Sequence, residues 1–201
     1  MSQVTCDIAV SIDGFAAGPN QSLENPIGEG VEKLHRWMFE AAEENAAELE
    51  AITAAGAYVM GRNMFGPGRG EWDEAWRGWW GDDPPYHAPV FVLTHHARAP
   101  LEMQGGTTFT FVTDGIESAL AQASAAAGDR DVAIAGGAST VNQYLAAGAI
   151  DELRLHVVPL ILGAGERLFD GVSRIDLEPL DVRRTDLVTH LRYRVPAGDR
   201  A

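Results

Sequence analysis

Two adjacent glycines separate a strand-like run from a helix-like run in DVAIAGGASTVNQYL, residues 131–145. If the first run is a buried strand, Gly136 and Gly137 lie at its carboxyl end, where open α/β sheets bind their ligands. Glycines leave room for a phosphate, and the following helix offers unpaired N–H groups together with the hydroxyls of Ser139 and Thr140. The segment therefore predicts an anion-binding cradle, and a plain tight turn is the alternative interpretation.

Two earlier segments end in a similar way. AYVMGRNMFG has a strand-like run that ends at Gly61 and is followed by Arg62, and VLTHHAR turns at Thr94 and His95. Three strand ends on one rim bring together the residue types that a dinucleotide with an additional phosphate requires. The alternatives are that Arg62 pairs only with a carboxylate, and that His95 belongs to a solvated loop or binds a metal. Because no further ligands stand at metal-site spacing, we expect no metal.

The elements that position these residues alternate along the chain. Short strands are expected at residues 4–12, 57–61, 89–94, 108–113 and 131–136. Helices are expected at residues 31–55 and 115–127, the second with Asp114 as its N-cap, and the β-rich part after Asp151 is typical of antiparallel strands. The alternation predicts an α/β fold with a mixed, mostly parallel central sheet flanked by helices, with antiparallel C-terminal strands, in a single domain over residues 1–201.

Composition limits the class of protein. The chain has 201 residues, and its 15 basic and 29 acidic residues give a formal net charge of -14, which repels nucleic acid and anionic lipid. The single cysteine, Cys6, lies in an apolar run, so we expect a buried structural thiol in a reducing compartment. The sequence has neither a signal-like start nor a long apolar run. We therefore expect a cytoplasmic protein that binds neither nucleic acid nor membrane.

One segment, residues 66–89, is rich in Gly, Pro and Trp and is too long for an ordinary connection. Its tryptophans either pack together as a satellite cluster or form the wall of a substrate pocket. In the second interpretation Trp79 and Trp80 bind the substrate, together with Leu160 from the later segment LILGAGERLF. Gly163 and Gly165 of that segment are equally consistent with β-bulges that bind nothing.

Five segments taken together resemble a known family: AVSIDGFAAG, VMGRNMF, VLTHHAR, IAGGASTVNQYL and IDELRLHVVPLILGAGERLF. In order and spacing they are similar to the dihydrofolate reductase superfamily, in the branch of the C-terminal reductase domain of the bifunctional riboflavin-biosynthesis deaminase-reductase. The resemblance implies NADPH as the cofactor. The residues that it implies for the adenosine phosphates are Gly61, Arg62, Thr94 and His95. Those implied for the pyrophosphate are Gly136, Gly137, Ala138, Ser139, Thr140 and Val141. The nicotinamide would contact Ala9 and Ala16, and core packing is the alternative role for Ala9.

The same resemblance implies a function. Asp13 matches the acidic residue of that branch in its S-x-D-G turn, whereas SLENPIGEGVEKLHRWMF does not reproduce the carboxylate pattern that serves dihydrofolate. The expected activity is NADPH-dependent hydride transfer to a small heterocycle of the pteridine or aminopyrimidine type. Asp13 would orient the acceptor or relay its proton, with Glu40 or Glu43 as alternatives, or would serve only the turn.

Two further expectations accompany this function. A non-catalytic protein that binds NADP(H) or a flavin nucleotide is the alternative to an enzyme. Relatives in the riboflavin branch pair through their late antiparallel strands, and LRLHVVPLIL and THLRYRV offer edge strands that need covering. We therefore expect a symmetric homodimer.

Overall fold

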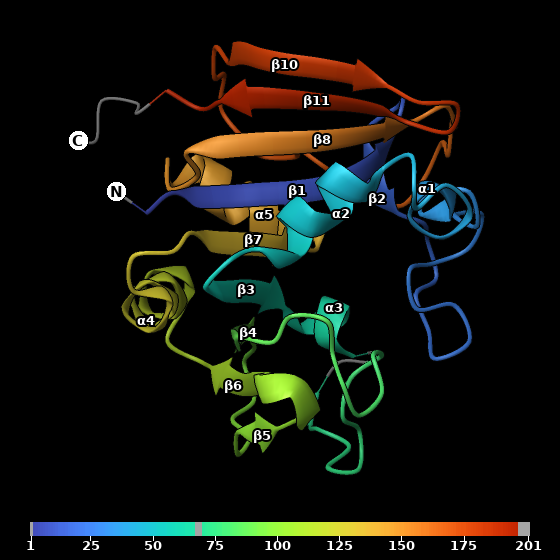
Figure 1. Ribbon diagram of the computed structural model, residues 1–201. Coiled ribbons are helices and arrows are strands. Elements are labelled where there is room, and N and C mark those ends of the chain that lie inside the picture. The colour runs from blue at the N-terminus through green and yellow to red at the C-terminus, as the bar shows by residue number, and fades with distance from the viewer. Residues whose placement is uncertain (1, 67–69, 197–201) are drawn as a thin grey trace.

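The computed structural model describes residues 2–66 and 70–196 and is organised around one large sheet (Figure 1). Its strands are β1 (Val4–Ser11), β2 (Phe15–Ala17), β3 (Ala57–Gly61), β4 (Pro89–Leu93), β5 (Leu101–Glu102), β6 (Thr108–Val112), β7 (Val132–Gly136), β8 (Glu152–Val158), β9 (Glu166–Arg167), β10 (Glu178–Arg184) and β11 (Thr189–Arg194). The helices are α1 (Arg36–Glu40), α2 (Ala46–Thr53), α3 (Arg62–Phe65), α4 (Ile116–Ala127) and α5 (Ala138–Ala146), with a 3-10 turn at Gln104–Gly106.

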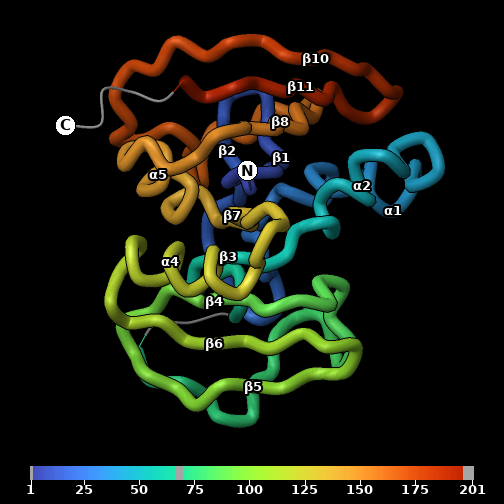
Figure 2. Tube along the Cα trace, turned by 60° about the vertical axis from the view of Figure 1, so that its left-hand side comes forward, coloured from blue at the N-terminus to red at the C-terminus, as the bar shows by residue number. Residues whose placement is uncertain are grey.

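The large sheet has 9 strands in the order β10-β11-β8-β1-β7-β3-β4-β6-β5, so β10 and β5 lie at opposite edges (Figure 2). From β8 to β6 the neighbours pair in parallel. Strands β10, β11 and β5 add antiparallel pairs at the two edges. The expected mixed sheet with antiparallel C-terminal strands is therefore confirmed.

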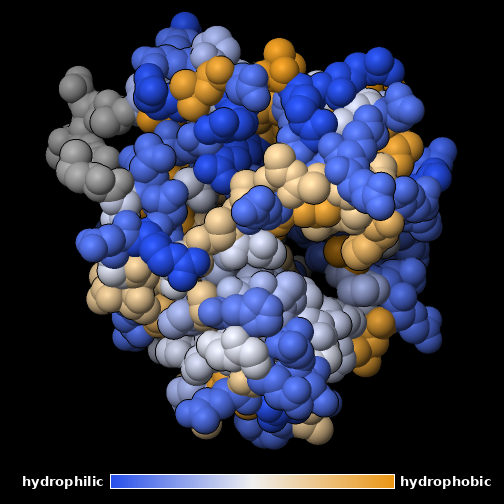
Figure 3. Space-filling view, in the orientation of Figure 1, coloured by the Kyte–Doolittle hydropathy of each residue, from blue (hydrophilic) through white to orange (hydrophobic). Residues whose placement is uncertain are grey.

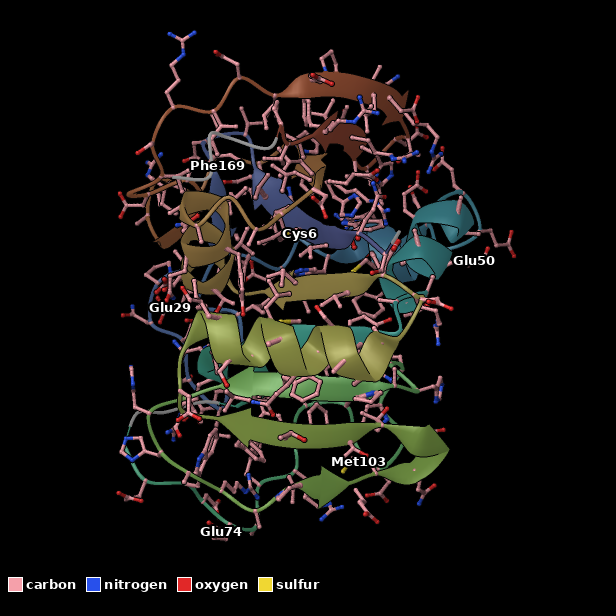
Figure 4. The ribbon with its side chains drawn as sticks, turned by 90° about the vertical axis from the view of Figure 1, so that its left-hand side faces the viewer. Cys6, Glu29, Glu50, Glu74, Met103 and Phe169 are labelled. Atoms are coloured by element: carbon pink, nitrogen blue, oxygen red, sulfur yellow. The ribbon has the colours of Figure 1, made fainter. Side chains whose placement is uncertain are left out.

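Helices α4 and α5 cover one face of the sheet. Side chains alternate between the two faces along each strand, and β1 directs Cys6, Ile8 and Val10 toward these helices. Ala119 and Ala123 of α4 pack against the same core, where their small side chains allow close approach. Cys6 lies in the interior (Figure 4), and burial raises the pKa of its thiol well above the usual value, as expected for a structural cysteine.

The opposite face is covered by two separate groups of side chains. Near β1 and β8, Leu34 and Trp37 pack on Ala9 and form a core with the α1–α2 segment. Near β3, β4 and β6, Phe65 and aromatic side chains of the segment between α3 and β4 form a second core with Val90. The carboxyl ends of the central strands lie between these two groups.

The predicted strands over the first 136 residues are confirmed, each within one residue at either end. The single helix predicted over residues 31–55 is wrong, because two short helices, α1 and α2, take its place. Between them Asn45 is buried, and its side-chain amide donates hydrogen bonds to the carbonyl oxygens of Trp37 (3.4 Å) and Ala41 (2.8 Å). The side-chain oxygen Oδ1 of Asn45 lies 2.8 Å from Nε2 of His190 in the sheet. These tertiary contacts end one helix and start the next.

The predicted N-cap at Asp114 is also wrong. Helix α4 begins at Ile116 after Gly115, which has φ 91°, and no side chain caps it. The positive φ suits glycine, so the backbone at Gly115 rather than a carboxylate sets the start of the helix. Strands β2, β9 and β5 were not predicted, because each has only two or three residues and is too short to show an alternating pattern.

Candidate functional site

Parallel strands end at one edge of the sheet, which we call the carboxyl rim. It consists of the residues that directly follow β1, β3, β4, β7 and β8, which are Ile12, Arg62, Thr94, Gly137 and Pro159. The space-filling view shows the surface hollowed at this rim, below α2 and above α3 as they lie in Figure 1, with apolar residues on its border (Figure 3). The three strand ends singled out in the sequence therefore share one edge.

The first turn of α5 provides an open position for an anion. Gly137 is the N-cap residue, no side chain caps the helix, and a Cβ added at Gly137 would meet no atom within 4 Å. The Gly136–Gly137 peptide bond is cis. Gly137 and Ser139 are exposed, whereas Ala138, Thr140 and Val141 are buried, and the N–H groups of Thr140 and Val141 donate to the Gly137 carbonyl oxygen at 3.0 and 3.1 Å.

Gly61 has a packing role at the same place. A Cβ at this position would collide with the Thr140 hydroxyl, so the missing side chain lets the end of β3 approach the first turn of α5. This close approach explains the glycine before any ligand is considered.

Arg62 opens α3 with its guanidinium over the indole of Trp72, with 3.8 Å between Cζ and the ring centroid. Its Nη2 donates a hydrogen bond to the Glu71 carbonyl oxygen at 3.3 Å. The Nε and Nη1 atoms are buried and have no hydrogen-bond partner among the described residues. Burial lowers the pKa of the Arg62 guanidinium, but an arginine stays charged in proteins. Such unsatisfied donors are rare and require an acceptor, for which an anion is the simplest candidate.

The turn after β4 carries a second arginine. The Thr94 hydroxyl accepts the N–H of His96 at 3.1 Å and closes the turn, while His95 is exposed. The Arg98 side chain is 0% exposed, and its Nη2 donates to the carbonyl oxygens of Glu74 (2.9 Å) and Trp76 (2.6 Å). Arg98 therefore fastens the segment between α3 and β4 to the turn.

Asp13 connects the ends of β1 and β8. Its carboxylate accepts the Ser11 hydroxyl at 2.7 Å and the backbone N–H groups of Leu162 and Gly163 at 3.0 and 2.7 Å. These hydrogen bonds, that of Ser11 first, lower the pKa of Asp13 to about 2. Asp13 is therefore ionised at neutral pH and is equipped to position the loop around it rather than to donate a proton.

The alternative carboxylates lie on the α1–α2 segment. Glu40 pairs with Arg36, at 2.7 Å from Nε and 2.5 Å from Nη2, and the hydrogen bond lowers its pKa. Glu43 is exposed. No hydrogen bond connects either carboxylate to the carboxyl rim in the described part of the chain.

Apolar side chains surround the Asp13 turn. The N–H of Ile12 donates to the carbonyl oxygen of Leu160 at 2.8 Å, and the side chains of Ile12 and Ile161 are 63% and 74% exposed. Ala9 is buried beneath Trp37, as core packing rather than nicotinamide contact would require, and Ala16 lies half-buried in β2. The end of the site at β1 and β8 therefore exposes apolar side chains beside Asp13 and Arg167, whose Nη1 donates to the Asp13 carbonyl oxygen at 3.1 Å, whereas the end at β3 and β4 is cationic.

The ring contacts of Trp79 and Trp80 favour packing within the loop over the substrate pocket with Leu160. Trp80 stacks on Phe109 of β6 with 5.8 Å between ring centroids, and Trp79 packs on Trp76 at 4.5 Å. Strand β6 lies five positions from β8, or about 24 Å at the usual strand spacing, so Trp80 packs on a strand far from the one that precedes Leu160. The satellite-cluster interpretation is the one that the contacts support. Residues 67–69 of this loop lie outside the described residues.

Two residues that touch the cationic end were not assigned from the sequence. Trp72 is a tryptophan of residues 66–89 and Arg98 is the last residue of VLTHHAR, and no role was predicted for either from the sequence. The composition of the loop signalled that it carries a function, but no periodic pattern indicates which of its rings meets Arg62.

Metal-binding clusters and membrane-spanning helices are absent from residues 2–66 and 70–196. No group of three or more His, Cys, Asp or Glu side chains there is placed to hold a metal ion. No helix in that part of the chain is long and apolar enough to cross a membrane.

The sheet order is that of a dihydrofolate reductase-like fold. The chain belongs to the RibD C-terminal domain family, whose family model matches residues 2–191.

Individual relatives are distant. A candidate riboflavin biosynthesis protein from Shewanella sp. PV-4 is 24% identical with a TM-score of 0.64, covering 96% of this chain and 99% of that one. RibD from Acinetobacter baumannii is 19% identical with a TM-score of 0.60, and the match covers 98% of this chain but 58% of RibD. The uncharacterised protein YyaP of Bacillus subtilis is 22% identical over 192 residues, 90% of this chain and 88% of YyaP.

Proposed function

We propose that this protein is an NADPH-dependent oxidoreductase that transfers hydride to a small heterocyclic substrate of the pteridine or aminopyrimidine type. The observation that carries the proposal is the state of Arg62, whose buried Nε and Nη1 atoms have no hydrogen-bond partner within residues 2–66 and 70–196. A phosphate on the adenosine ribose distinguishes NADPH from NADH, and it would supply charge-assisted acceptors for these donors.

The pyrophosphate would lie at the first turn of α5. Exposed Gly137 leaves this position open, and the N-terminus of a nine-residue helix favours negative charge. The residues present therefore fit the dinucleotide along the rim from β3 and β4 toward β7. When bound, the cofactor supplies the hydride.

The acceptor would lie at the apolar end of the rim. Exposed Ile12 and Ile161 offer surface for a flat ring and exclude water around the reacting atoms. Asp13 holds the Leu162–Gly163 backbone beside that surface, so its proposed role is to position this loop against the acceptor. The three hydrogen bonds that Asp13 accepts support this positioning role.

The experiment is a panel of pteridine and aminopyrimidine compounds, tested for loss of NADPH absorbance in the presence of the protein. Turnover with NADPH that exceeds turnover with NADH supports the proposal. Purified protein that carries a flavin, or that binds NADPH but oxidises it with no member of the panel, would favour a nucleotide-binding protein without this activity.

A further inference from the structure

Trp72 contacts the two arginines of the cationic end. The Arg62 guanidinium lies 3.8 Å from the centroid of its ring, and Cζ of Arg98 lies 5.5 Å from it. Because Arg62 follows β3 and Arg98 belongs to the turn after β4, one indole spans both strand ends. In Figure 1 the segment that carries Trp72 runs from α3 to β4, beside α3.

The indole itself is fixed on several sides. Its Nε1–H donates to the carbonyl oxygen of His96 at 2.7 Å, and its ring packs edge-on against Phe65 (5.7 Å) and Phe111 (5.0 Å). A ring held by a hydrogen bond and two aromatic neighbours has little rotational freedom. A guanidinium stacked on it shares this restriction.

The neighbouring residues reinforce this arrangement from the same segment. The Glu71 carbonyl oxygen accepts from Arg62, and the Glu71 carboxylate lies 3.3 Å from Nδ1 of His96. The carbonyl oxygens of Glu74 and Trp76 accept from Arg98. Glu74 lies at the outer edge of the molecule (Figure 4), and its side chain is 76% exposed, so this part of the segment has its outer side in solvent.

We infer that residues 71–76 form a clamp that sets cofactor specificity, with Trp72 as the residue that positions Arg62 for the phosphate on the adenosine ribose. This inference rests on the proposed function. The clamp gives the Trp-rich loop, residues 66–89, a role at the cationic end of the site, where the cofactor phosphate would bind, rather than at the end near β1 and β8. An arginine held in one orientation loses less freedom when it binds a phosphate, so the clamp favours NADPH and leaves NADH, which lacks that phosphate, unaffected.

The test compares equilibrium binding of NADPH and NADH to wild type, Trp72→Leu and Trp72→Phe. Leucine removes the stacking face and the indole N–H but keeps apolar bulk against Phe65 and Phe111, whereas phenylalanine keeps a ring face and loses only the N–H. We expect Trp72→Leu to weaken NADPH by about 3- to 30-fold, the range of a cation–π contact, with NADH changed by less than about twofold. Trp72→Phe is expected to lie between wild type and Trp72→Leu.

Trp79→Leu is the matched control, because Trp79 lies in the same loop and packs on Trp76 rather than on an arginine. It should leave the ratio of NADPH to NADH affinity at the wild-type value. A thermal melt of each variant separates a general loss of folding, which lowers both affinities, from a selective effect.

Three outcomes would overturn the inference. If Trp72→Leu and Trp72→Phe keep the wild-type preference for NADPH, Trp72 does not position Arg62. If either variant binds NADPH more tightly than wild type, the segment covers Arg62 instead of presenting it. If the wild type itself has no preference for NADPH, the proposed function fails, and the inference fails with it.

Discussion

The Asp13 carboxylate accepts the backbone N–H of Gly163 at 2.7 Å and so joins the end of β1 to the loop after β8. The N–H of Leu162 and the Ser11 hydroxyl complete its hydrogen bonds and lower its pKa to about 2. A carboxylate in this state has no proton to give at neutral pH. Asp13 would therefore affect catalysis by fixing the position of the loop that contains Leu162 and Gly163.

Asp13→Asn should lower turnover while leaving the cofactor bound. An amide keeps one acceptor oxygen, so at least one of the N–H groups of Leu162 and Gly163 loses its partner and the loop shifts. We expect turnover on any substrate found to fall by about 10- to 100-fold, the effect of a small misplacement, with NADPH affinity within a few-fold of wild type. Steady-state kinetics and equilibrium binding measure the two effects separately.

The pH profile distinguishes positioning from proton transfer at Asp13. Because its pKa lies near 2, the acidic limb of kcat between about pH 4 and pH 7 should be the same in wild type and Asp13→Asn. Disappearance of that limb in the variant would show that Asp13 itself titrates during catalysis.

A buried histidine pair predicts sensitivity of folding to acid. Nδ1 of His156 lies 2.8 Å from Nδ1 of His190, beneath Trp37, and burial together with His156 lowers the pKa of His190 to about 4. The other groups that face His190 are Asn45 and the paired Glu48 and Arg183. Below the ordinary histidine pKa of about 6.5, the unfolded chain takes up a proton that folded His190 refuses, so stability falls as the pH drops.

The size of this effect can be measured by urea unfolding. His190 should account for about 2 kcal/mol of the stability lost between about pH 7.5 and pH 5. His190→Gln should lose correspondingly less over the same interval, because glutamine does not titrate. Equal losses in wild type and variant would show that His190 has no lowered pKa in the folded state.

The edge strand β10 predicts self-association. The expectation that LRLHVVPLIL and THLRYRV offer edge strands is wrong, because their strands β8 and β11 each have a neighbour on both sides. Strand β10 is outermost instead, and Leu180 and Val182 on it are 39% and 65% exposed. An uncovered edge with apolar side chains favours pairing with another copy, so we expect a symmetric homodimer at micromolar concentration by light scattering. Val182→Lys should yield a folded monomer, because lysine on an edge opposes strand pairing. A monomeric wild type would contradict the expected dimer.

The central strands were predictable because their patterns are local. AYVMG and PVFVL are short apolar runs bounded by turn residues, and both form strands at or within one residue of the expected bounds. The break between α1 and α2 was not predictable, because it depends on the contacts of Asn45 with Trp37, Ala41 and His190, which lies 145 residues away. Local propensity carries no information about such a partner.

The candidate site divides in the same way. The positions of Gly61, Arg62, Thr94 and Gly137 at strand ends follow from strand pattern alone, and the parallel sheet brings those ends to one rim. The contacts within the Trp-rich loop depend on side-chain packing between distant segments, as in the contact between Trp80 and Phe109. Length and composition therefore marked the loop as unusual but did not indicate which side chains its rings contact.

The most direct measurement of the central proposal is equilibrium binding of NADPH and NADH to the wild type and to Arg62→Ala. The loss of a charge-assisted hydrogen bond costs about 1.5 to 3 kcal/mol, so Arg62→Ala should weaken NADPH by about 10- to 100-fold and NADH much less. Arg77→Ala is the matched control, because this arginine of the same loop donates to the Glu102 carbonyl oxygen and should leave both affinities unchanged. Equal affinities of the wild type for the two cofactors, or equal losses in Arg62→Ala, would contradict the account.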